Sequence, residues 1–525
     1  MSTTDVKTTP KPPLPPLHGP WPMVSPFGRR WPGPGRAASP ATVLAVLFAS
    51  VVAALSVPLD RGGVGWLVTA LAGTAAVVVA RLIPHRPHST VPFPALALPA
   101  RRDDPARYGW ATVTVLLLGV GTVRAAGWLV LLCLATACLT GTLAVAGGRS
   151  VRAMAVALLM AIGSGFRALP WMTRGLDAIR SPGRGRDGTR IAATVAVSIA
   201  LLVVFGSLFA SADAGFANLL RKAGPDIDAA TVTRWIFVFV VTLGILGGAA
   251  YLRAAPPNLS GMDGGSAKPV SRLEWAIPLT LLVLLFTLFV ALQLAVLFGD
   301  SRYVLDTAGL TYAEYARSGF WELLVVTGLT LLVLAGAVRW APRATTTDRA
   351  LIRAILGALA VLTLVIVASA LHRMNVYAGT YGLTRLRILV ALCELWLGVT
   401  FLLVIVAGIR LRAAWLPRVV VAAGVLALLG LAAANPDRLI AEQNITRYEE
   451  TGRIDLGYLA DLSADAVPAL LDLPQPLRDC AVLDNHDRLT SDPGDWRGWS
   501  YGRAHAADLL RGPRPQNHPA CASSY

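Results

Sequence analysis

The chain has 525 residues, of which 55% are hydrophobic and 15% are charged, whereas soluble domains have roughly 25% charged residues. Its net charge of +16 is unevenly distributed, because the segment from Asn435 onward holds 9 Arg against 14 Asp and Glu. The excess of Lys and Arg therefore lies in short connections between apolar stretches. This positive-inside pattern is typical of a membrane protein and argues against nucleic acid as a partner.

The first forty residues form a Pro-rich arm ahead of the first apolar stretch. They include eleven prolines and too few apolar residues to bury a core, so residues 1–40 are predicted to be a disordered cytoplasmic arm. The arm is too long and too rich in proline for the start of a signal peptide. A solvated tail is favoured over a polyproline II ligand at Pro12–Pro16.

Apolar stretches of about 20 residues, long enough to cross a bilayer as helices, recur from residue 41 to residue 434. This pattern predicts an all-α fold, a polytopic bundle of transmembrane helices over 41–434. Eleven spans are expected, at about 41–58, 63–82, 110–123, 125–146, 191–210, 231–251, 276–298, 321–340, 350–371, 388–409 and 417–434.

Residues 151–170 are also apolar, but Arg residues flank them densely. If this stretch does not span, 28 Lys and Arg lie on one side of the membrane and 10 on the other; if it spans, the numbers are 20 and 18. Only the first split shows the excess of Lys and Arg on one side that the positive-inside rule predicts. Segment 151–180 is therefore predicted to be interfacial or re-entrant, with a cytoplasmic N-terminus and an extracytoplasmic C-terminus. Twelve spans are the alternative.

The polar segment after residue 434 is predicted to be a small extracytoplasmic tail. Asn435 suits a helix N-cap, Pro436 the first helical position, and Asp437 the positive end of the helix dipole. Short helices are expected over 435–475. Because two short helices cannot make a stable core alone, they should rest against the membrane domain or a partner. Residues 476–525 are predicted to be polar and largely irregular.

The five cysteines fall into two groups. Cys133, Cys138 and Cys393 lie within apolar stretches and should stay reduced, whereas Cys480 and Cys521 are the two cysteines of the tail. On an oxidising side of the membrane, such a pair suggests a Cys480–Cys521 disulfide that closes a loop of about forty residues.

Three sequence blocks resemble a known family. The blocks are Gly309–Leu323, Tyr377–Arg387, and the tail from Asn435 through Ile445 with Arg447-Tyr448, Ile454-Asp455, Tyr458-Leu459 and Leu462–Pro468. Through them the chain, over about residues 190–475, is similar to bacterial multi-pass membrane proteins catalogued only as a domain of unknown function of the 4153/4173 type. The resemblance implies a helical membrane fold and carries over no activity.

All three blocks fall on the predicted outer face. The candidate interaction residues there are Thr311, Tyr312, Glu314, Tyr315, Arg317, Tyr377, Tyr381, Arg385, Arg387, Asn435, Asp437, Asn444, Arg447, Tyr448 and Asp455. For the first block, an amphipathic entry helix with Tyr at headgroup depth is the alternative to a ligand-lining role. The tail helices over 435–470 are expected to pack over the loops at 311–320 and 377–387.

Arg385 and Arg387 run against the inside bias, because they lie on the predicted outer face. Pairing with tail acids such as Glu442, Glu449 or Asp455 would explain them. Contact with anionic lipid headgroups would explain them equally well.

Glu394 is a carboxylate placed well inside a predicted span. A charge at that depth costs a few kcal/mol, so such residues usually face a cavity or a partner. In a transporter, Glu394 would be a proton or cation site, with Gln293 as a second intramembrane polar group. The alternative is a protonated Glu394 that is hydrogen-bonded to a neighbouring helix, or one close enough to the interface to reach water.

No catalytic, cofactor-binding or metal-binding motif is present: the tail His and Asp residues lack a recognised ligand spacing, and no phosphate loop or nucleophile elbow occurs. The sequence therefore predicts a non-enzymatic, multi-pass protein of the bacterial cytoplasmic membrane, without a cofactor. It would act through its outer face as an envelope sensor, regulator or assembly partner, in contact with the bilayer and an envelope protein. The alternative is a proton- or cation-linked transporter. A polar cavity that reaches Glu394 would favour transport, and a closed bundle with a grooved outer surface would favour a sensor or scaffold.

Overall fold

The structure is a computed structural model that describes residues 31, 33–82, 104–177, 229–259, 270–298, 320–342, 345–410, 413–491 and 494–516, together with isolated positions elsewhere. All regular elements within these ranges are helices. Ten of the described helices are long and apolar enough to cross a membrane. The predicted polytopic helical bundle is confirmed.

Four antiparallel helices form the core of a first bundle: α2 (Pro40–Ser56), α3 (Val64–Leu82), α4 (Ala106–Val123) and α5 (Gly127–Val145). The side chain of Ser39 caps α2 by accepting a hydrogen bond from the backbone N–H of Thr42, and Pro40 occupies the first turn, where its missing N–H costs nothing. Short turns join α2 to α3 and α4 to α5. Both turns therefore lie at the same end of the bundle.

A second bundle contains α10 (Arg272–Phe298), α13 (Phe320–Trp340), α14 (Thr346–Tyr381), α15 (Arg385–Arg410) and α16 (Leu416–Ala434). A capping box between Thr345 and Asp348 starts α14. This helix has 36 residues, or about 54 Å, so it extends beyond the hydrocarbon core of about 30 Å. Gly382, with a φ of +83°, ends it and turns the chain into α15.

Helix α16 joins the two bundles. Val425 and Leu428 of α16 pack in one apolar cluster with Leu117 of α4 and Leu129 of α5. At the far end of the same helix, Arg418 forms an ion pair of 2.7 Å with Asp104, just before α4. Burial acts to raise the pKa of Asp104, but the hydrogen bond and charge of Arg418 hold it below its ordinary value.

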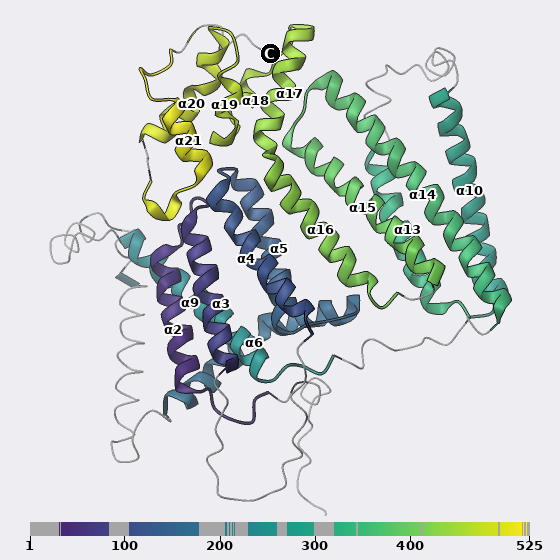
Figure 1. The fold of residues 1–525 in the computed structure, drawn as a ribbon, viewed down its shortest axis with the longest axis horizontal. Helices are drawn as coiled ribbons and strands as arrows, with labels where there is room; N and C mark the ends of the chain where they lie inside the picture. The colour runs from purple at the N-terminus through teal and green to yellow at the C-terminus, as the bar shows by residue number, and fades with distance from the viewer. Residues whose placement is uncertain are drawn as a thin grey trace, which may run out of the picture.

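The contacts of α6 (Val151–Asp177) bear on the predicted non-crossing segment. Its length and composition suffice for a span. However, Met154 packs with Trp110 at the start of α4, and Trp171 donates to the carbonyl of Arg36 just before α2. The starts of α2 and α4 lie at the same end of the bundle, so both ends of α6 reach that end. Figure 1 shows α6 passing across the lower ends of these helices, an arrangement that supports an interfacial helix.

Helix α9 (Ala229–Ala254) fills the space between α6 and the first bundle. It contacts α6 at close range through small residues, because a Cβ on Gly248 would meet the Ser164 hydroxyl at 2.4 Å and one on Gly165 would meet the Gly244 carbonyl at 3.0 Å. The predicted span at 191–210 lies largely outside the described residues. The structure therefore leaves the total of eleven spans untested.

The arm is ordered where it meets the first bundle. Trp31 is only 1% exposed, and its indole N–H donates to the carbonyl of Ala255 at 3.2 Å. The Arg167 guanidinium lies over the same ring, 4.4 Å from its centre. The prediction of disorder is therefore wrong for the end of the arm, because a single Trp supplies the apolar anchor; residues 1–30 lie outside the described part of the chain.

Residues 435–521, here called the cap, sit on the end of the bundles that carries the α4–α5 turn (Figure 1). The cap contains α17 (Pro436–Thr451), α18 (Leu456–Ala460), η2 (Ala464–Ala466), α19 (Val467–Leu470), α20 (Leu477–Ser491), η3 (Trp496–Gly498) and α21 (Tyr501–Leu509). Ile440, Leu459, Leu470 and Val482 belong to one buried cluster at its centre. A disulfide joins Cys480 to Cys521, with their Cα atoms 5.4 Å apart, as the sequence had suggested.

The prediction that 476–525 is largely irregular is wrong. Helix α20 alone has 15 residues and buries Cys480, Ala481 and Val482, and Ser500 caps α21 by accepting from the N–H of Arg503. The error has a physical cause. The segment is polar on average, but it has a short apolar face. This face is buried because α17–α19 provide a surface for it to pack against.

Candidate functional site

The carboxylate of Asp437, in the first turn of α17, fixes the cap to the second bundle. It is completely buried, and the guanidinium of Arg385, at the start of α15, donates to it at 3.0 Å. The indole N–H of Trp128 in α5 donates to Oδ1 at 3.0 Å, and the backbone N–H of Ser463 donates to Oδ2 at 2.9 Å. One carboxylate therefore holds together α15, α5 and the cap.

The charge on this buried carboxylate is stabilised by its partners. Burial acts to raise the pKa of Asp437, but the hydrogen bonds from Arg385 and Ser463 and the Arg385 charge hold it below its ordinary value. Asp437 is therefore ionised at neutral pH, and its pairing with Arg385 is a charge-assisted contact of the strong kind.

A second buried carboxylate, Asp465, fixes the cap to the first bundle. It is 3% exposed, and its Oδ2 accepts from the backbone N–H groups of Ala125 at 2.7 Å and Ala126 at 3.0 Å. These residues immediately precede α5, where the backbone N–H groups lack helical partners and favour an anion. Burial raises the pKa of Asp465 despite these bonds, and its Oδ1 has no hydrogen-bond partner in the described part of the chain.

The α14–α15 turn packs directly under α17. The side-chain amide of Asn444 donates to the carbonyl of Leu383 at 2.8 Å, and Arg447 Nε donates to the carbonyl of Thr380 at 3.0 Å. A Cβ on Gly382 would lie 2.2 Å from the Asn444 side chain, so this close approach requires glycine. The expected packing of the 435–470 helices over 377–387 is thus present, whereas 311–319 lies outside the described residues.

The α2–α3 turn receives the other edge of the cap. Val64 N–H donates to the carbonyl of Trp499 at 3.0 Å, and Arg503 donates to the carbonyl of Gly62 at 2.5 Å. A Cβ on Gly63 would lie 2.4 Å from the carbonyl oxygen of Arg497. The cap therefore contacts three turns, two in the first bundle and one in the second.

The ion-pair partners of Arg385 differ from those that the sequence suggested. Arg385 pairs with Asp437 and, at 3.2 Å, with Asp461. Of the acids proposed instead, Glu442 pairs with Arg438 four residues away, and Asp455 caps α18 by accepting from the N–H of Tyr458. Local geometry satisfies these acids first, so they were the wrong partners.

Other predicted site residues are placed as follows. Asn435 has a left-handed φ of 57° and its side chain accepts from the N–H of Arg438, which agrees with the predicted N-cap. The rings of Tyr377 and Tyr381 contact each other in the last turn of α14 at a tilt of 50°, with ring centres 4.9 Å apart, and Tyr448 packs against the cap core. The remaining candidates, in the first block, lie outside the described residues: Thr311, Tyr312, Glu314, Tyr315 and Arg317.

Sequence reasoning missed Asp465, Ser463 and Trp128 as parts of this junction. Asp465 and Ser463 stand within one of the blocks that resemble the family, which was a usable signal. Trp128 lies near the start of a predicted span, where an interfacial Trp is common and gives no sign of a specific partner. Its hydrogen bond to Asp437 joins residues 309 positions apart in sequence, which no local pattern encodes.

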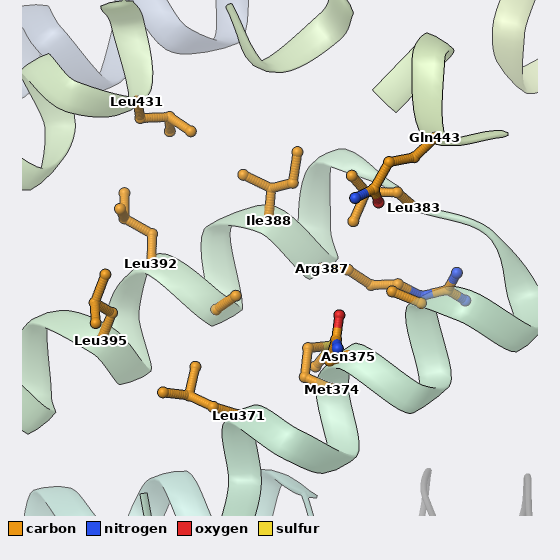
Figure 2. A pocket seen from close by; sticks show the side chains of 12 residues that line it. Leu371, Met374, Asn375, Leu383, Arg387, Ile388, Leu392, Leu395, Leu431 and Gln443 are labelled. Carbon is orange, nitrogen blue, oxygen red and sulfur yellow. The ribbon is translucent and has the colours of Figure 1, made fainter. Parts of the chain in front are cut away.

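The two intramembrane polar residues, Glu394 in α15 and Gln293 in α10, are each buried. Glu394 is 1% exposed and Gln293 is 8% exposed, and their side-chain oxygens and nitrogen have no hydrogen-bond partner among the described residues. A groove of about 380 Å³ runs along the neighbouring face of α15 between α14, α16 and α17 (Figure 2), but Glu394 is not among its lining residues. The described residues also contain no group of three or more His, Cys, Asp or Glu that could hold a metal ion.

One family model matches residues 112–473 of the chain, and its description is a domain of unknown function, DUF4153. This range begins within α4 and ends within the cap. It therefore includes both buried carboxylates and the helices α5, α15 and α17 that their contacts connect. No curated protein and no solved structure shows a significant match.

Proposed function

Because the chain belongs to the DUF4153 family, which brings no activity with it, we propose a function from the geometry: a non-enzymatic envelope sensor or regulator. In this proposal the cap receives a signal or partner outside the membrane and transmits it to the transmembrane helices. The observation that carries it is the pair of buried carboxylates, Asp437 and Asp465. They tie one extramembrane domain to both bundles at once.

An extracytoplasmic cap is part of this proposal. With α6 not crossing, 28 Lys and Arg outside the cap lie on the side opposite the cap and 10 lie on the side of the cap, the bias that the positive-inside rule predicts if the cap is outside. The Cys480–Cys521 disulfide also suits an oxidising compartment. The lower ends of α2, α4 and α14, together with α6, would then face the cytoplasm.

The contacts support transmission because they act on helix ends. Asp437 contacts Arg385 in the first turn of α15, and Asp465 binds the N–H groups that start α5. A helix is stiff along its axis, so a displacement at its first turn moves its far end as well. A tilt of the cap would therefore change the relative positions of α5 and α15, which belong to different bundles.

Proton- or cation-linked transport is the second candidate, favoured by Glu394 and Gln293. Both side chains are buried and have no hydrogen-bond partner among the residues that the structure describes, which is costly in a bilayer unless they serve a pathway or bind water. The described groove does not reach Glu394, which is why we place transport second.

The first experiment separates the two candidates. The purified full-length chain would be reconstituted into liposomes that contain a pH-sensitive dye, and proton flux would be measured under an imposed gradient. We expect wild type and Glu394→Gln to match protein-free liposomes. A flux that wild type supports and Glu394→Gln abolishes would overturn the sensor proposal in favour of transport.

The second experiment tests transmission. Spin labels would be placed at Leu82 and Ile409, which are 70% and 65% exposed and lie at the ends of α3 and α15 away from the cap. Leu82 represents the first bundle, to which α5 belongs, and Ile409 represents the second. The background would lack the three free cysteines. We expect Asp437→Asn to shift or broaden the distance between the labels, and the exposed-site control Asp461→Asn to leave it unchanged. An unchanged distance in Asp437→Asn, with hydrogen exchange showing a loosened cap, would show that the cap is passive.

A further inference from the structure

The groove beside the cap has one polar end and one apolar end. Arg387, Asn375 and Gln443 line the end next to the cap, and Leu371, Leu392 and Leu395 line the other (Figure 2). The polar residues come from the start of α15, the end of α14 and the middle of α17. The groove thus runs from the boundary between bundle and cap into the apolar part of the bundle.

Arg387 and its neighbour Arg385 have different interaction partners. The two residues are two positions apart, which is about 200° around a helix, so they face opposite sides of α15. Arg385 turns to the cap and pairs with Asp437 and Asp461. Arg387 donates to the carbonyl of Gly382 and lies over the Tyr377 ring at 4.3 Å, and the ion pairs of the described residues do not include it.

The apolar part of the groove is long enough to hold part of an acyl chain. Leu395 lies eight residues beyond Arg387 on α15, or about 12 Å deeper along the helix axis. Ile388, Ala391 and Leu392 line the wall between them, and Leu431 of α16 closes one side. A ligand that fits has an anionic group at the level of Arg387 and a hydrocarbon chain that extends into the bilayer.

We propose that this groove binds one anionic phospholipid, with the phosphate on Arg387 and an acyl chain against Leu392 and Leu395. The Tyr377 ring and the Gly382 carbonyl hold the guanidinium in place, so little side-chain freedom is lost on binding. Gln443 extends over the headgroup position from α17. The lipid therefore touches both the second bundle and the cap, and this site is independent of the sensor proposal.

The test uses the full-length protein in nanodiscs that contain equal amounts of phosphatidylglycerol and phosphatidylcholine. After transfer to detergent, native mass spectrometry counts the lipids retained per chain. We expect wild type to retain one phosphatidylglycerol in preference to phosphatidylcholine. Arg387→Gln should weaken this retention about five- to tenfold, as for the loss of one basic contact at a membrane surface. Arg339→Gln, an exposed arginine in the last turn of α13, is the matched control and should retain the lipid.

A second variant tests the groove without any change of charge, so that the result does not depend on whether Arg387→Gln folds correctly. Ala391→Phe keeps every charge but fills the groove, and it should lose the retained lipid while Arg387 stays intact. Equal retention of the two lipids by wild type would overturn the proposal. So would undiminished phosphatidylglycerol retention in Arg387→Gln, and loss in Ala391→Phe alone would reduce the site to an unselective hydrocarbon groove.

Discussion

The buried carboxylate of Asp437 offers the sharpest test of how the cap is held. Asp437→Asn conserves shape but removes the negative charge, and its amide N–H₂ faces groups that are themselves donors: Arg385, Trp128 and the N–H of Ser463. The substitution therefore leaves a half-buried guanidinium without its main counter-charge. We expect the cap to loosen from the bundles while the transmembrane helices stay folded.

The expected loss of stability in Asp437→Asn follows from the burial of the ion pair. Removal of one partner from a buried ion pair costs about 3–5 kcal/mol. Arg385 keeps 26% of its side chain exposed and retains Asp461 as a second partner, so we expect the low end of this range, about 3 kcal/mol. Asp461 itself is 65% exposed, and loss of such a surface pair costs about 0–1 kcal/mol.

Hydrogen exchange on α17–α19 in nanodiscs is the assay, because it reports local opening of the cap in the intact protein. Asp437→Asn should raise exchange there by roughly two orders of magnitude, and Asp461→Asn should change it by less than about fivefold. In a double-mutant cycle, Arg385→Gln combined with Asp437→Asn should cost less than the sum of the two single variants. Equal effects of Asp437→Asn and Asp461→Asn would refute the argument that burial decides the strength of this contact.

Reduction of the Cys480–Cys521 disulfide should destabilise the cap by about 4 kcal/mol, the chain-entropy value for the 41-residue separation; a Cys480→Ser, Cys521→Ser variant with unaltered protease resistance would contradict this. Gly502→Ala should destabilise the cap although alanine favours helices, because the new Cβ would lie 1.9 Å from the Asp465 carboxylate; a matching Gly457→Ala in α18, where the nearest atom is at 3.6 Å, should be neutral or stabilising in the same thermal melt. Strong acid should loosen the Asp437 contact: the pKa of this carboxyl is lowered in the folded protein, so its contribution is complete above the ordinary pKa of about 3.9 and is lost as pH falls through the folded value. Asp465, whose pKa is raised, acts in the opposite sense, but only at pH values above that ordinary pKa. Hydrogen exchange as a function of pH should show this loss in wild type and a weaker one in the asparagine variant. A reporter enzyme fused to the C-terminus should be active only if the enzyme works outside the membrane, and activity of a cytoplasmic reporter would reverse the proposed orientation.

The sequence by itself determined the helical membrane fold and most of its span positions. Apolar stretches near 20 residues have no stable alternative in a bilayer, so the ends of most described helices agree with the prediction to within a few residues. The exception is α14, which continues ten residues beyond the predicted end at 371, to Tyr381. The helix start at Asn435 was readable for a similar reason, since an N-cap depends on residues within one turn. The pairing of Cys480 with Cys521 was readable because these are the two cysteines in the tail.

Only the tertiary structure decided which charges and rings meet. Arg385 and Asp437 are 52 residues apart, and other acids of the tail, such as Glu442 and Asp455, were equally plausible partners by sequence; the structure gives each of these two a local partner instead. Trp31 looked like part of a solvated arm, yet it is buried because Ala255 and Arg167 provide a site for its ring. Such contacts join elements that are far apart in the sequence, and no periodicity or motif spacing in the sequence marks them. Their choice depends on how the helices pack, which short-range patterns in the sequence do not specify.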